Sequence, residues 1–366
     1  MDSTMQRTPL LISSLMRYGA LVHADQKVIT WTGDGSRSIT YRQVGEQAAQ
    51  LAHALRSLGV TGDQRVGTFM WNNAEHLITY LAVPSMGAVL HALNIRLFPP
   101  QIIYVANHAD DRVVIVDNTL AKPFAGLLPH LPRVQHVIVN GPIDAETLAA
   151  LQDPAHVEGV HDWTELLAGQ PTAYDWPLDL DEDSASSMCY TSGTTGNPKG
   201  VAYSHRSNYL HAVTAALALG ARQDDRLLVV VPLFHANAWG FPYLAMAAGA
   251  SLVMPDRFLQ AAPLAAMMEQ EKVTFGAGVP TIWNDLLRHL DTSPADLSAC
   301  RGLVVGGSAA PPALMKAFQA KHDVTIIHAW GMTEMSPIGT VATPPAHLEV
   351  GTDDYWRYAA SQGRLV

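Results

Sequence analysis

Apolar residues recur at helical spacing along residues 40–58, which gives the clearest element that the pattern predicts. The residues on this apolar face are Val44, Ala48, Leu51, Ala52, Leu55 and Leu58. Thr40 and Gln43 have the spacing of a capping box, in which each side chain bonds the backbone N–H of the other residue. Gly59 follows directly and suits the left-handed residue that ends a helix. The pattern therefore predicts an amphipathic helix with both ends defined.

Short apolar runs alternate with helical patterns along the rest of the chain. The predicted strands are residues 65–70, 112–117, 135–139, 227–231, 251–254, 273–275, 302–305 and 324–328. Helical patterns between them include 261–271, 281–290 and 312–321, and the acidic stretch 176–186 resembles a linker. Several strands are continuously apolar, as in a parallel sheet that is covered on both faces. We therefore predict an α/β fold with two packed, mixed or parallel sheets flanked by helices.

Composition narrows the class of protein. The 366 residues are 48% hydrophobic and 15% charged, which is typical of a globular chain. The formal net charge of −10 argues against a nucleic-acid partner or an anionic membrane surface. The longest apolar run, residues 241–254, is too short for a membrane span, which needs roughly 20 residues. Residues 10–15 are too short for a signal peptide, and Cys189 and Cys300 suit buried thiols. We expect a cytoplasmic protein without a transmembrane segment.

The run of residues 190–200, YTSGTTGNPKG, carries the strongest chemical signal. Its glycines let backbone N–H groups converge on an anion, its hydroxyls add donors, and Lys199 adds a positive charge. The order differs from the common nucleotide loop G-x-x-x-x-G-K-[ST], because Gly200 stands where Ser or Thr is required. The composition predicts a phosphate-binding loop of another kind.

This run resembles the phosphate-loop signature of the adenylate-forming (AMP-binding) superfamily. Two later segments support the resemblance in order and spacing, GGSAAP at 306–311 and AWGMTE at 329–334. The segment HANAW at 235–239, paired with VVGGSAAP at 304–311, is most similar to medium- and long-chain fatty acyl-CoA synthetases. The resemblance runs from about residue 10 to the last residue. It implies ATP-dependent activation of a fatty acid to acyl-AMP and then acyl-CoA.

The resemblance implies a nucleotide site with ATP, Mg²⁺ and CoA (as a substrate). The implied nucleotide-binding residues are Thr191, Ser192, Gly193, Thr194, Thr195, Gly196, Lys199, Gly307, Ser308, Ala309, Ala329, Trp330, Gly331, Met332 and Thr333. The implied catalytic residues are Thr194, Lys199, His235, Thr333 and Glu334. Thr194 and Glu334 are the expected magnesium ligands, because Mg²⁺ prefers oxygen ligands. Trp330 is expected to stack on adenine.

The substrate pocket is expected beside the nucleotide. Its implied residues are His235, Trp239, Gly278, Val305, Gly306 and Gly307. Amino-acid-activating relatives have an aspartate where this chain has His235, so a plain carboxylic acid is favoured over an amino acid. Trp239 is either a wall or gate of the acyl pocket or an ordinary core aromatic. The length of the acyl chain stays open, because a single side chain can close a tunnel.

The family pattern also implies a division of the chain. Residues 63–211 would form a first α/β subdomain that ends in the phosphate loop, and 8–62 with 212–345 a second. Residues 346–366 would start an incomplete β-barrel region. Family members continue for well over a hundred residues, through the rest of the barrel and a C-terminal lid domain with the adenylating lysine. We therefore expect a truncated N-terminal adenylating domain, weakly active alone, and a homodimer is possible.

Two other functions stay open. One is a ligase for an aryl, short-chain or amino acid. The other is a non-catalytic module that binds a nucleotide or an acyl group. The acid dependence of pyrophosphate release separates the first from a fatty acyl-CoA ligase.

Overall fold

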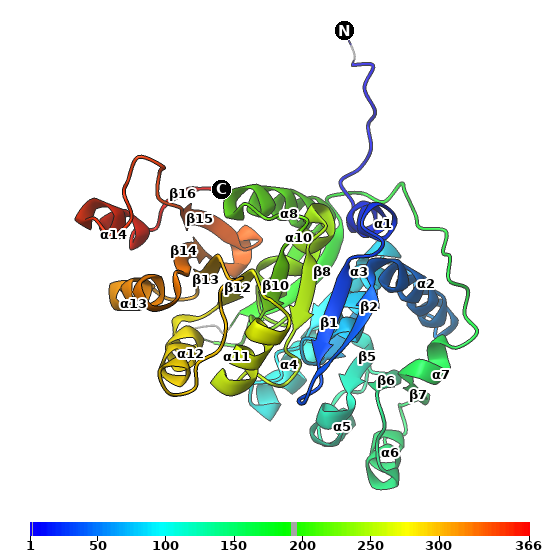
Figure 1. The fold of residues 1–366 in the computed structure, drawn as a ribbon. Helices are drawn as coiled ribbons and strands as arrows, with labels where there is room; N and C mark the ends of the chain where they lie inside the picture. Colours follow the sequence, from blue (N-terminus) through cyan, green and yellow to red (C-terminus); the bar gives the residue numbers. More distant parts are fainter. Residues whose placement is uncertain (2, 192–195) are drawn as a thin grey trace.

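The structure is a computed structural model that describes residues 1, 3–191 and 196–366. The predicted phosphate-loop residues Ser192, Gly193, Thr194 and Thr195 lie outside the described residues. Within the described ranges, the strands form a seven-stranded and a nine-stranded sheet (Figure 1). Helices cover both sheets and separate them, so the predicted α/β fold with two packed sheets is confirmed.

The seven-stranded sheet has the order β7-β6-β5-β3-β4-β8-β9. Its strands are β3 (Arg65–Phe69), β4 (Val89–Ala92), β5 (Asp111–Asp117), β6 (His136–Asn140), β7 (Gly159–Asp162), β8 (Ala185–Thr191) and β9 (Lys199–Ser204). All neighbours run parallel except β8 and β9, which are antiparallel. The carboxyl ends of β3, β4, β5, β6 and β8 therefore share one edge of the sheet.

The nine-stranded sheet has the order β16-β15-β14-β13-β12-β10-β11-β1-β2. Its strands are β1 (Lys27–Trp31), β2 (Ser36–Thr40), β10 (Arg226–Val229), β11 (Ser251–Met254), β12 (Phe275–Gly278), β13 (Gly302–Val305), β14 (Thr325–Gly331), β15 (Ile338–Ala342) and β16 (Arg364–Leu365). The strands from β14 to β1 run parallel, and antiparallel strands flank them at both ends. The parallel strands again place their carboxyl ends at one edge.

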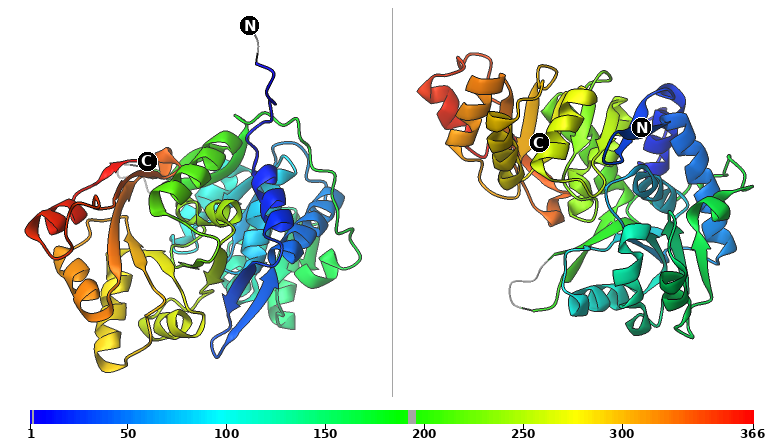
Figure 2. Two further views of the ribbon diagram at one scale, coloured as in Figure 1. Left: turned by 45° about the horizontal axis from the view of Figure 1, so that its top comes forward. Right: turned by 60° about the horizontal axis from the view of Figure 1, so that its bottom comes forward.

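Helices connect the strands and cover both sheets. They are α1 (Ile12–Val22), α2 (Tyr41–Ser57), α3 (Ala74–Ser85), α4 (Pro99–Ala109), α5 (Asn118–Ala125), α6 (Ala145–Gln152), α7 (Trp163–Leu167), α8 (His205–Leu219), α9 (Ala236–Trp239), α10 (Phe241–Ala248), α11 (Ala261–Gln270), α12 (Pro280–Thr292), α13 (Pro312–His322) and α14 (Asp353–Ala359), with short 3-10 turns η1 (Leu128–His130) and η2 (Thr333–Met335). In both views of Figure 2, α11–α14 (yellow to red) lie at the opposite end of the molecule from α5–α7.

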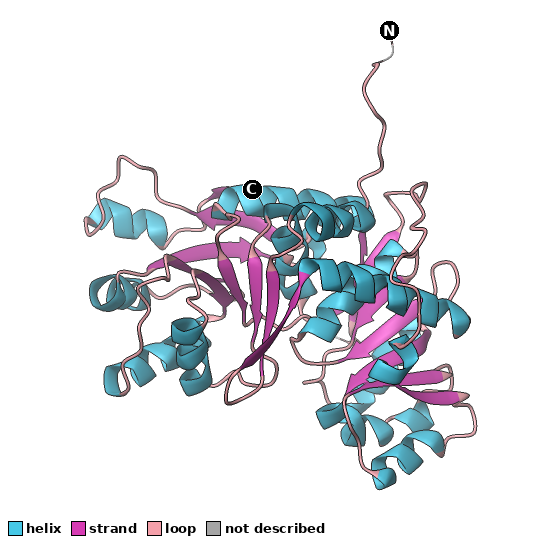
Figure 3. Ribbon diagram, turned by 45° about the vertical axis from the view of Figure 1, so that its right-hand side comes forward, coloured by secondary structure: helices cyan, strands magenta, loops and turns pink. Residues whose placement is uncertain are grey.

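One large hydrophobic core joins the two sheets. It combines side chains of α1, α2, α3, α8 and α10 with Val66 and Leu90 of one sheet and Leu227 and Val229 of the other. Smaller clusters fill the outer faces, under α11–α14 on the nine-stranded sheet and under α4, α5 and η1 on the seven-stranded sheet. Figure 3 shows helices packed along the strands of both sheets. The shared layer buries apolar surface from both sheets and therefore fixes their relative position.

The predicted helix at 40–58 is confirmed as α2. The side chain of Thr40 accepts from the backbone N–H of Gln43, and Gln43 accepts from the N–H of Thr40, which is the predicted capping box. Gly59 has a φ of 84° just after the helix. The predicted strands also form, with shifted ends: the strand expected at 273–275 is β12, which begins at Phe275 because Val273 closes the turn after α11. The strand expected at 227–231 ends at Val229, and the one expected at 324–328 continues to Gly331.

The end of the chain adds α14 and β16, and β16 pairs with β15 at the edge of the nine-stranded sheet. The predicted subdomain boundaries and the barrel at 346–366 stay predictions. No helix in the described part of the chain is both long and apolar enough to span a bilayer.

Candidate active site

A cavity of about 390 Å³ lies beyond the carboxyl ends of β8, β13 and β14. Its walls are Asn94, Leu97, Tyr190, Thr191, Pro198, His235, Ala236, Trp239, Gly306, Gly307, Ala329, Trp330, Gly331, Met332, Thr333, Glu334, Pro337 and Ile338. In open α/β sheets, ligands bind at this edge, because loops from several strands converge there. The cavity, named here the nucleotide cavity, unites residues from all three sequence segments that the resemblance singled out.

The root of the predicted phosphate loop forms one wall. Tyr190 and Thr191 end β8, and Thr191 pairs with Lys199 at the start of β9. The hydroxyl of Tyr190 lies 2.7 Å from Nδ1 of His108, which holds the ring at the cavity edge. Gly196 and Lys199 are exposed and are not among the residues that line the cavity. Their roles on phosphate stay predictions.

A glycine turn after β13 forms the opposite wall. A Cβ on Gly306 would lie 2.9 Å from Cη2 of Trp239 and 3.3 Å from the carbonyl oxygen of Ala329. Gly307 has a φ of 77°, a conformation that favours glycine. The backbone can therefore border the cavity closely only with glycine at both positions. Ser308 and Ala309 lie exposed beyond this turn, outside the cavity lining.

The end of β14 and the turn η2 supply the polar wall. Ala329, Trp330 and Gly331 lie at the strand end, and the side chain of Trp330 is 42% exposed, with its ring free to pack against a planar ligand. Thr333 and Glu334 begin η2 and also line the cavity. Within the described ranges, Glu334 has no hydrogen-bond or ion-pair partner, so its carboxylate is available to a ligand.

A second cavity of about 240 Å³, the apolar cavity, adjoins the first. It is lined by Asn94, Arg96, Val230, Val231, Pro232, Phe234, His235, Trp239, Gly278, Val279 and Ile282. His235 and Trp239 therefore belong to both cavities. Desolvation by the surrounding protein, and then the charge of Arg96, lower the pKa of His235, which favours the neutral imidazole at neutral pH.

Val305 departs from the expected substrate pocket. Its side chain is fully buried, belongs to the core cluster under α11–α14, and is not among the residues that line either cavity. Neighbouring side chains of a strand point to opposite faces, and Val304 belongs to the other core cluster. Gly278, Gly306 and Gly307 do line the cavities.

An unusual backbone segment places Trp239 between the cavities. Ala236, Asn237, Ala238 and Trp239 have φ values of 46°, 52°, 48° and 54°, so α9 is a left-handed turn. A left-handed residue other than glycine costs about 1–2 kcal/mol. Tertiary contacts must therefore hold this turn. No local residue pattern predicts this turn, because the segment contains no glycine before Gly240.

Sequence reasoning also missed several cavity residues. Asn94 and Arg96 follow β4, and Pro337 and Ile338 lie at the start of β15. The sequence places them far from the recognised motifs, and only the order of the strands brings them together. Only their positions just outside strand ends could have indicated from the sequence that these residues line a cavity.

Comparison with known proteins identifies the family. The model of the family described as "AMP-binding enzyme" matches residues 17–366. The chain belongs to this AMP-binding enzyme family. Among curated relatives, it is 38% identical to 3-methylmercaptopropionyl-CoA ligase of Ruegeria lacuscaerulensis over 364 residues, which cover 98% of this chain and 66% of the relative. It is 40% identical to a medium-chain-fatty-acid–CoA ligase of Ectopseudomonas oleovorans over 365 residues, covering 98% and 65%.

Solved structures agree with this family. The structure of the anthranilate CoA ligase AuaEII in complex with anthranoyl-AMP has a TM-score of 0.86 and 26% identity, covering 100% of this chain and 66% of that chain. For the long-chain-fatty-acid–CoA ligase FadD1 of Archaeoglobus fulgidus, the TM-score is 0.83 with 22% identity, over 100% of this chain and 71% of that one. This AMP-binding enzyme chain therefore spans about two thirds of the length of the curated relatives it matches.

The donor set of this AMP-binding enzyme fits a magnesium ion carried by phosphate. Among residues 1, 3–191 and 196–366, no three His, Cys, Asp or Glu side chains form a group that could hold a metal. Mg²⁺ is commonly bound through one or two carboxylates plus substrate phosphates and waters. A single unpaired carboxylate, Glu334, at the wall of the cavity matches that pattern. Thr194, the second expected ligand, lies outside the described residues.

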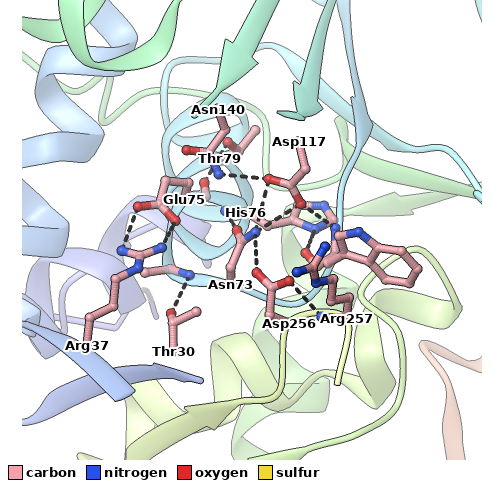
Figure 4. Close-up of polar contacts among 12 residues, drawn as sticks. Thr30, Arg37, Asn73, Glu75, His76, Thr79, Asp117, Asn140, Asp256 and Arg257 are labelled. Atoms are coloured by element: carbon pink, nitrogen blue, oxygen red, sulfur yellow. Dashed lines mark hydrogen bonds and ion pairs between the residues drawn. The ribbon is translucent and has the colours of Figure 1, made fainter. Parts of the chain in front are cut away.

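A third cavity of about 420 Å³, the polar cleft, is lined by residues at the carboxyl ends of β1, β5 and β6. Figure 4 shows its charged and amide side chains. The carboxylate of Asp117 accepts from the Asn73 amide at 3.0 and 3.1 Å, from the Asn140 amide at 2.7 Å and from the N–H of Trp71 at 2.7 Å. The same Asn73 amide donates to Asp256 at 3.3 Å, across to the nine-stranded sheet.

A bidentate ion pair completes this link between the sheets. Arg37 of β2 donates to both carboxylate oxygens of Glu75 on α3, at 2.6 and 2.9 Å. Burial raises the pKa of Asp117 to about 7, although its hydrogen bonds oppose the rise. The carboxylates of the polar cleft are satisfied by protein donors, so the cleft fastens the two sheets together.

Proposed function

We propose that this protein activates an aliphatic carboxylic acid with ATP and then passes the acyl group to CoA. In the first step, a carboxylate oxygen of the acid attacks the α-phosphorus of ATP, forming acyl-AMP and releasing pyrophosphate. In the second, the thiolate of CoA attacks the acyl carbon, and AMP leaves. The observation that carries the proposal is the shared wall of His235 and Trp239 between a polar and an apolar cavity. That junction suits a molecule with an acyl chain on one side and a nucleotide on the other.

The nucleotide roles follow from position. Thr191, at the root of the loop, would hold the β- and γ-phosphates together with Lys199 and the loop glycines. Thr333 would donate to the α-phosphate, and Trp330 would pack against adenine. Glu334 would hold Mg²⁺, which neutralises charge on the phosphates and the leaving pyrophosphate when it is bound. A neutral His235 would lie beside the reacting carboxylate without attracting an ammonium group.

The volume of the apolar cavity constrains the length of the acyl chain that the protein accepts. Pockets for drug-sized ligands usually measure about 300–1,000 Å³, and this cavity measures about 240 Å³. It therefore favours a short or medium acyl chain over a long one. Relatives that are 38–40% identical are named for 3-methylmercaptopropionyl-CoA, medium-chain and long-chain fatty acids, so the preference for a shorter chain rests on the cavity volume. A ligase for a short-chain acid is accordingly the second candidate, supported by the cavity volume.

The test is acid-dependent exchange of radioactive pyrophosphate into ATP. Acids from acetate to palmitate, benzoate and several amino acids are compared with Mg²⁺ present. Exchange that peaks between about three and ten carbons is expected if the apolar cavity holds the acyl chain. A peak with benzoate would favour an aryl acid, and a peak with an amino acid would contradict the role given to His235.

A binding assay tests the site if the protein shows no pyrophosphate exchange with any acid. Isothermal titration with ATP, with AMP and with an unreactive acyl-sulfamoyl adenosine reports the site directly. Tight binding of the mimic without exchange would favour a non-catalytic nucleotide- and acyl-binding module. Absence of binding in a folded sample would contradict the proposed function. Formation of a homodimer stays a separate prediction.

A further inference from the structure

All four residues of the left-handed turn α9 are buried, and Asn237 is the one whose side chain both donates and accepts hydrogen bonds. Asn237 is 1% exposed and sits in the middle of four successive residues with positive φ. Asparagine tolerates this conformation better than other residues with a side chain, but Ala236, Ala238 and Trp239 do not share that tolerance. The turn therefore depends on contacts with the rest of the protein.

The contacts of Asn237 reach the strand that leads into the predicted phosphate loop. Its amide nitrogen donates to the hydroxyl of Ser187 on β8 at 3.2 Å and to the side-chain oxygen of Asn208 on α8 at 3.3 Å. Its amide oxygen accepts from the thiol of Cys189, also on β8, at 3.5 Å. The same oxygen accepts from the hydroxyl of Tyr80 at 3.4 Å. Both ends of the amide are thus satisfied inside the core.

The backbone of the turn faces the same strand. Burial raises the pKa of the Cys189 thiol to about 11, and the N–H groups of Asn237 and Ala236 oppose that rise, because they point toward the sulfur. Asn208 in turn donates to Ser186 and Ser187 at 3.0 and 3.1 Å. A closed network of buried polar groups therefore joins the turn to β8, only a few residues before Tyr190 and Thr191 reach the nucleotide cavity.

The outcome of this geometry is the position of Trp239. Its indole lies between the nucleotide cavity and the apolar cavity and lines both. On one side, Gly306 leaves space for the ring, since a Cβ there would lie 2.9 Å from Cη2. Trp239 also packs in the large hydrophobic core, and the hydrogen bonds of Asn237 add a polar connection between its turn and β8.

Resting on the proposed function, we propose that Asn237 is a positioning residue for acyl selectivity: by fastening the turn 236–239 to β8, its amide sets where the Trp239 indole separates the two cavities. Asn237 does not line either cavity and is not a catalytic residue. Loss of the amide lets the indole move, which changes the space for the acyl chain. Thr333 and Glu334 on η2 are expected to keep their positions, because none of the side-chain hydrogen bonds of Asn237 reaches them.

The decisive variant is Asn237→Gly, because glycine adopts the left-handed conformation without strain and removes only the side chain. Isothermal titration measures Kd for AMP and for two unreactive mimics, propionyl- and octanoyl-sulfamoyl adenosine. The ratio of the two mimic Kd values is expected to change on the order of tenfold, the scale of selectivity from fitting a few methylenes. The Kd for AMP is expected to change less than about twofold. Ser187→Ala, which removes one acceptor of the amide, is expected to shift the ratio less and in the same direction.

A matched control separates positioning from a general loss of stability. Asn73 is also buried to 1% exposure and bonds several partners, but it lies in the polar cleft. Asn73→Gly is expected to lower the melting temperature and leave the mimic ratio unchanged. If folded Asn237→Gly protein binds both mimics with the wild-type ratio of Kd values, the inference is overturned and the proposed function is not. Wild-type protein that binds neither AMP nor the mimics would overturn the proposed function and the inference with it.

Discussion

The nucleotide cavity and the polar cleft both lie at carboxyl ends of parallel strands, yet their polar groups are used in opposite ways. In the polar cleft, Asp117 accepts from Asn73, Asn140 and Trp71, and Arg37 is paired with Glu75. In the nucleotide cavity, Glu334 has no partner among the described residues. The buried carboxylate of Asp117 is held by protein donors, whereas the exposed carboxylate of Glu334 at a cavity wall is available for a ligand. Two sites with similar residue types therefore differ in what they do.

The backbone conformations of the two regions also differ. The polar cleft is built on regular strand ends, such as Asp117 at the end of β5 and Asn140 at the end of β6. The nucleotide cavity borders a left-handed turn and a glycine turn with a φ of 77° at Gly307. Conformations of this kind persist where the surrounding structure holds them and are concentrated at functional sites. The comparison predicts that variants in one region change ligand binding, and variants in the other change stability.

The largest effect is expected from Glu334→Gln. Loss of the carboxylate should reduce magnesium-dependent pyrophosphate exchange roughly 100- to 1,000-fold, with the melting temperature unchanged. Exchange is measured under conditions in which the wild-type protein shows acid-dependent pyrophosphate exchange. Glu349→Gln, at an exposed site outside both cavities, is the matched control. Wild-type exchange in Glu334→Gln would remove this residue from the metal site.

The next effect tests the polar cleft. Asp117→Ala leaves the amide of Asn140 and the N–H of Trp71 without their acceptor, and it leaves the Asn73 amide only its longer bond to Asp256. Unpaired buried donors cost about 1–3 kcal/mol each, so the free energy of unfolding should fall by about 3 kcal/mol, measured by urea denaturation. Asp354→Ala on α14, in an exposed ion pair with Arg357, should cost less than about 1 kcal/mol. Reduced AMP affinity in a folded Asp117→Ala protein would contradict the separation of the two regions.

The pH dependence of stability sharpens this contrast. The pKa of Asp117 is raised to about 7 in the folded protein, so the folded state holds a proton that the unfolded chain has released. This contribution is complete below the unfolded pKa and is lost as pH rises through about 7. Relative to Asp117→Asn, the wild-type free energy of unfolding should fall by up to about 2 kcal/mol between pH 5.5 and 7. Parallel pH profiles of the two proteins would show that Asp117 is ionised throughout.

The smallest effect is expected from Trp239→Ala. Its indole lines both cavities, so its loss should change the preferred acid on the order of tenfold while AMP affinity stays within about twofold. Pyrophosphate exchange across a series of acids gives the profile. Trp356→Ala on α14, a half-buried tryptophan far from the cavities, is the control. If Trp239→Ala leaves the acid profile of a folded protein unchanged, Trp239 is an ordinary core aromatic.

Local patterns were enough to predict much of the fold. The helix α2 carries its own start and stop signals in Thr40, Gln43 and Gly59, and the apolar runs mark parallel strands wherever both faces are covered. The glycine turn after β13 and the end of β14 could also be predicted from local patterns, because the sequence itself contains the glycines and the apolar runs that mark strand ends. These elements depend on residues close to one another in the chain.

Other features depend on contacts between distant segments. Asp117 and Asp256 share the Asn73 amide only because β5 and β11 belong to sheets that pack together. The assignment of Val305 to the pocket required the direction of its side chain, which alternates along a strand and was not fixed by the motif. The left-handed turn has no local signal, since its conformation comes from Asn237 and the core around it.

The pairing of β1 with β11 also determines when the N-terminal strand can join its sheet during synthesis of the chain. Val28 lies beside Leu252, so the N-terminal hairpin cannot join the nine-stranded sheet until more than 220 further residues have been made. At about 5–20 residues per second, the ribosome needs on the order of ten to fifty seconds for that stretch. The seven-stranded sheet, with strands between residues 65 and 204, is complete earlier and can fold first. During that delay the edge of β1 that pairs with β11 stays without its partner strand, and such an unpaired edge can pair with another chain.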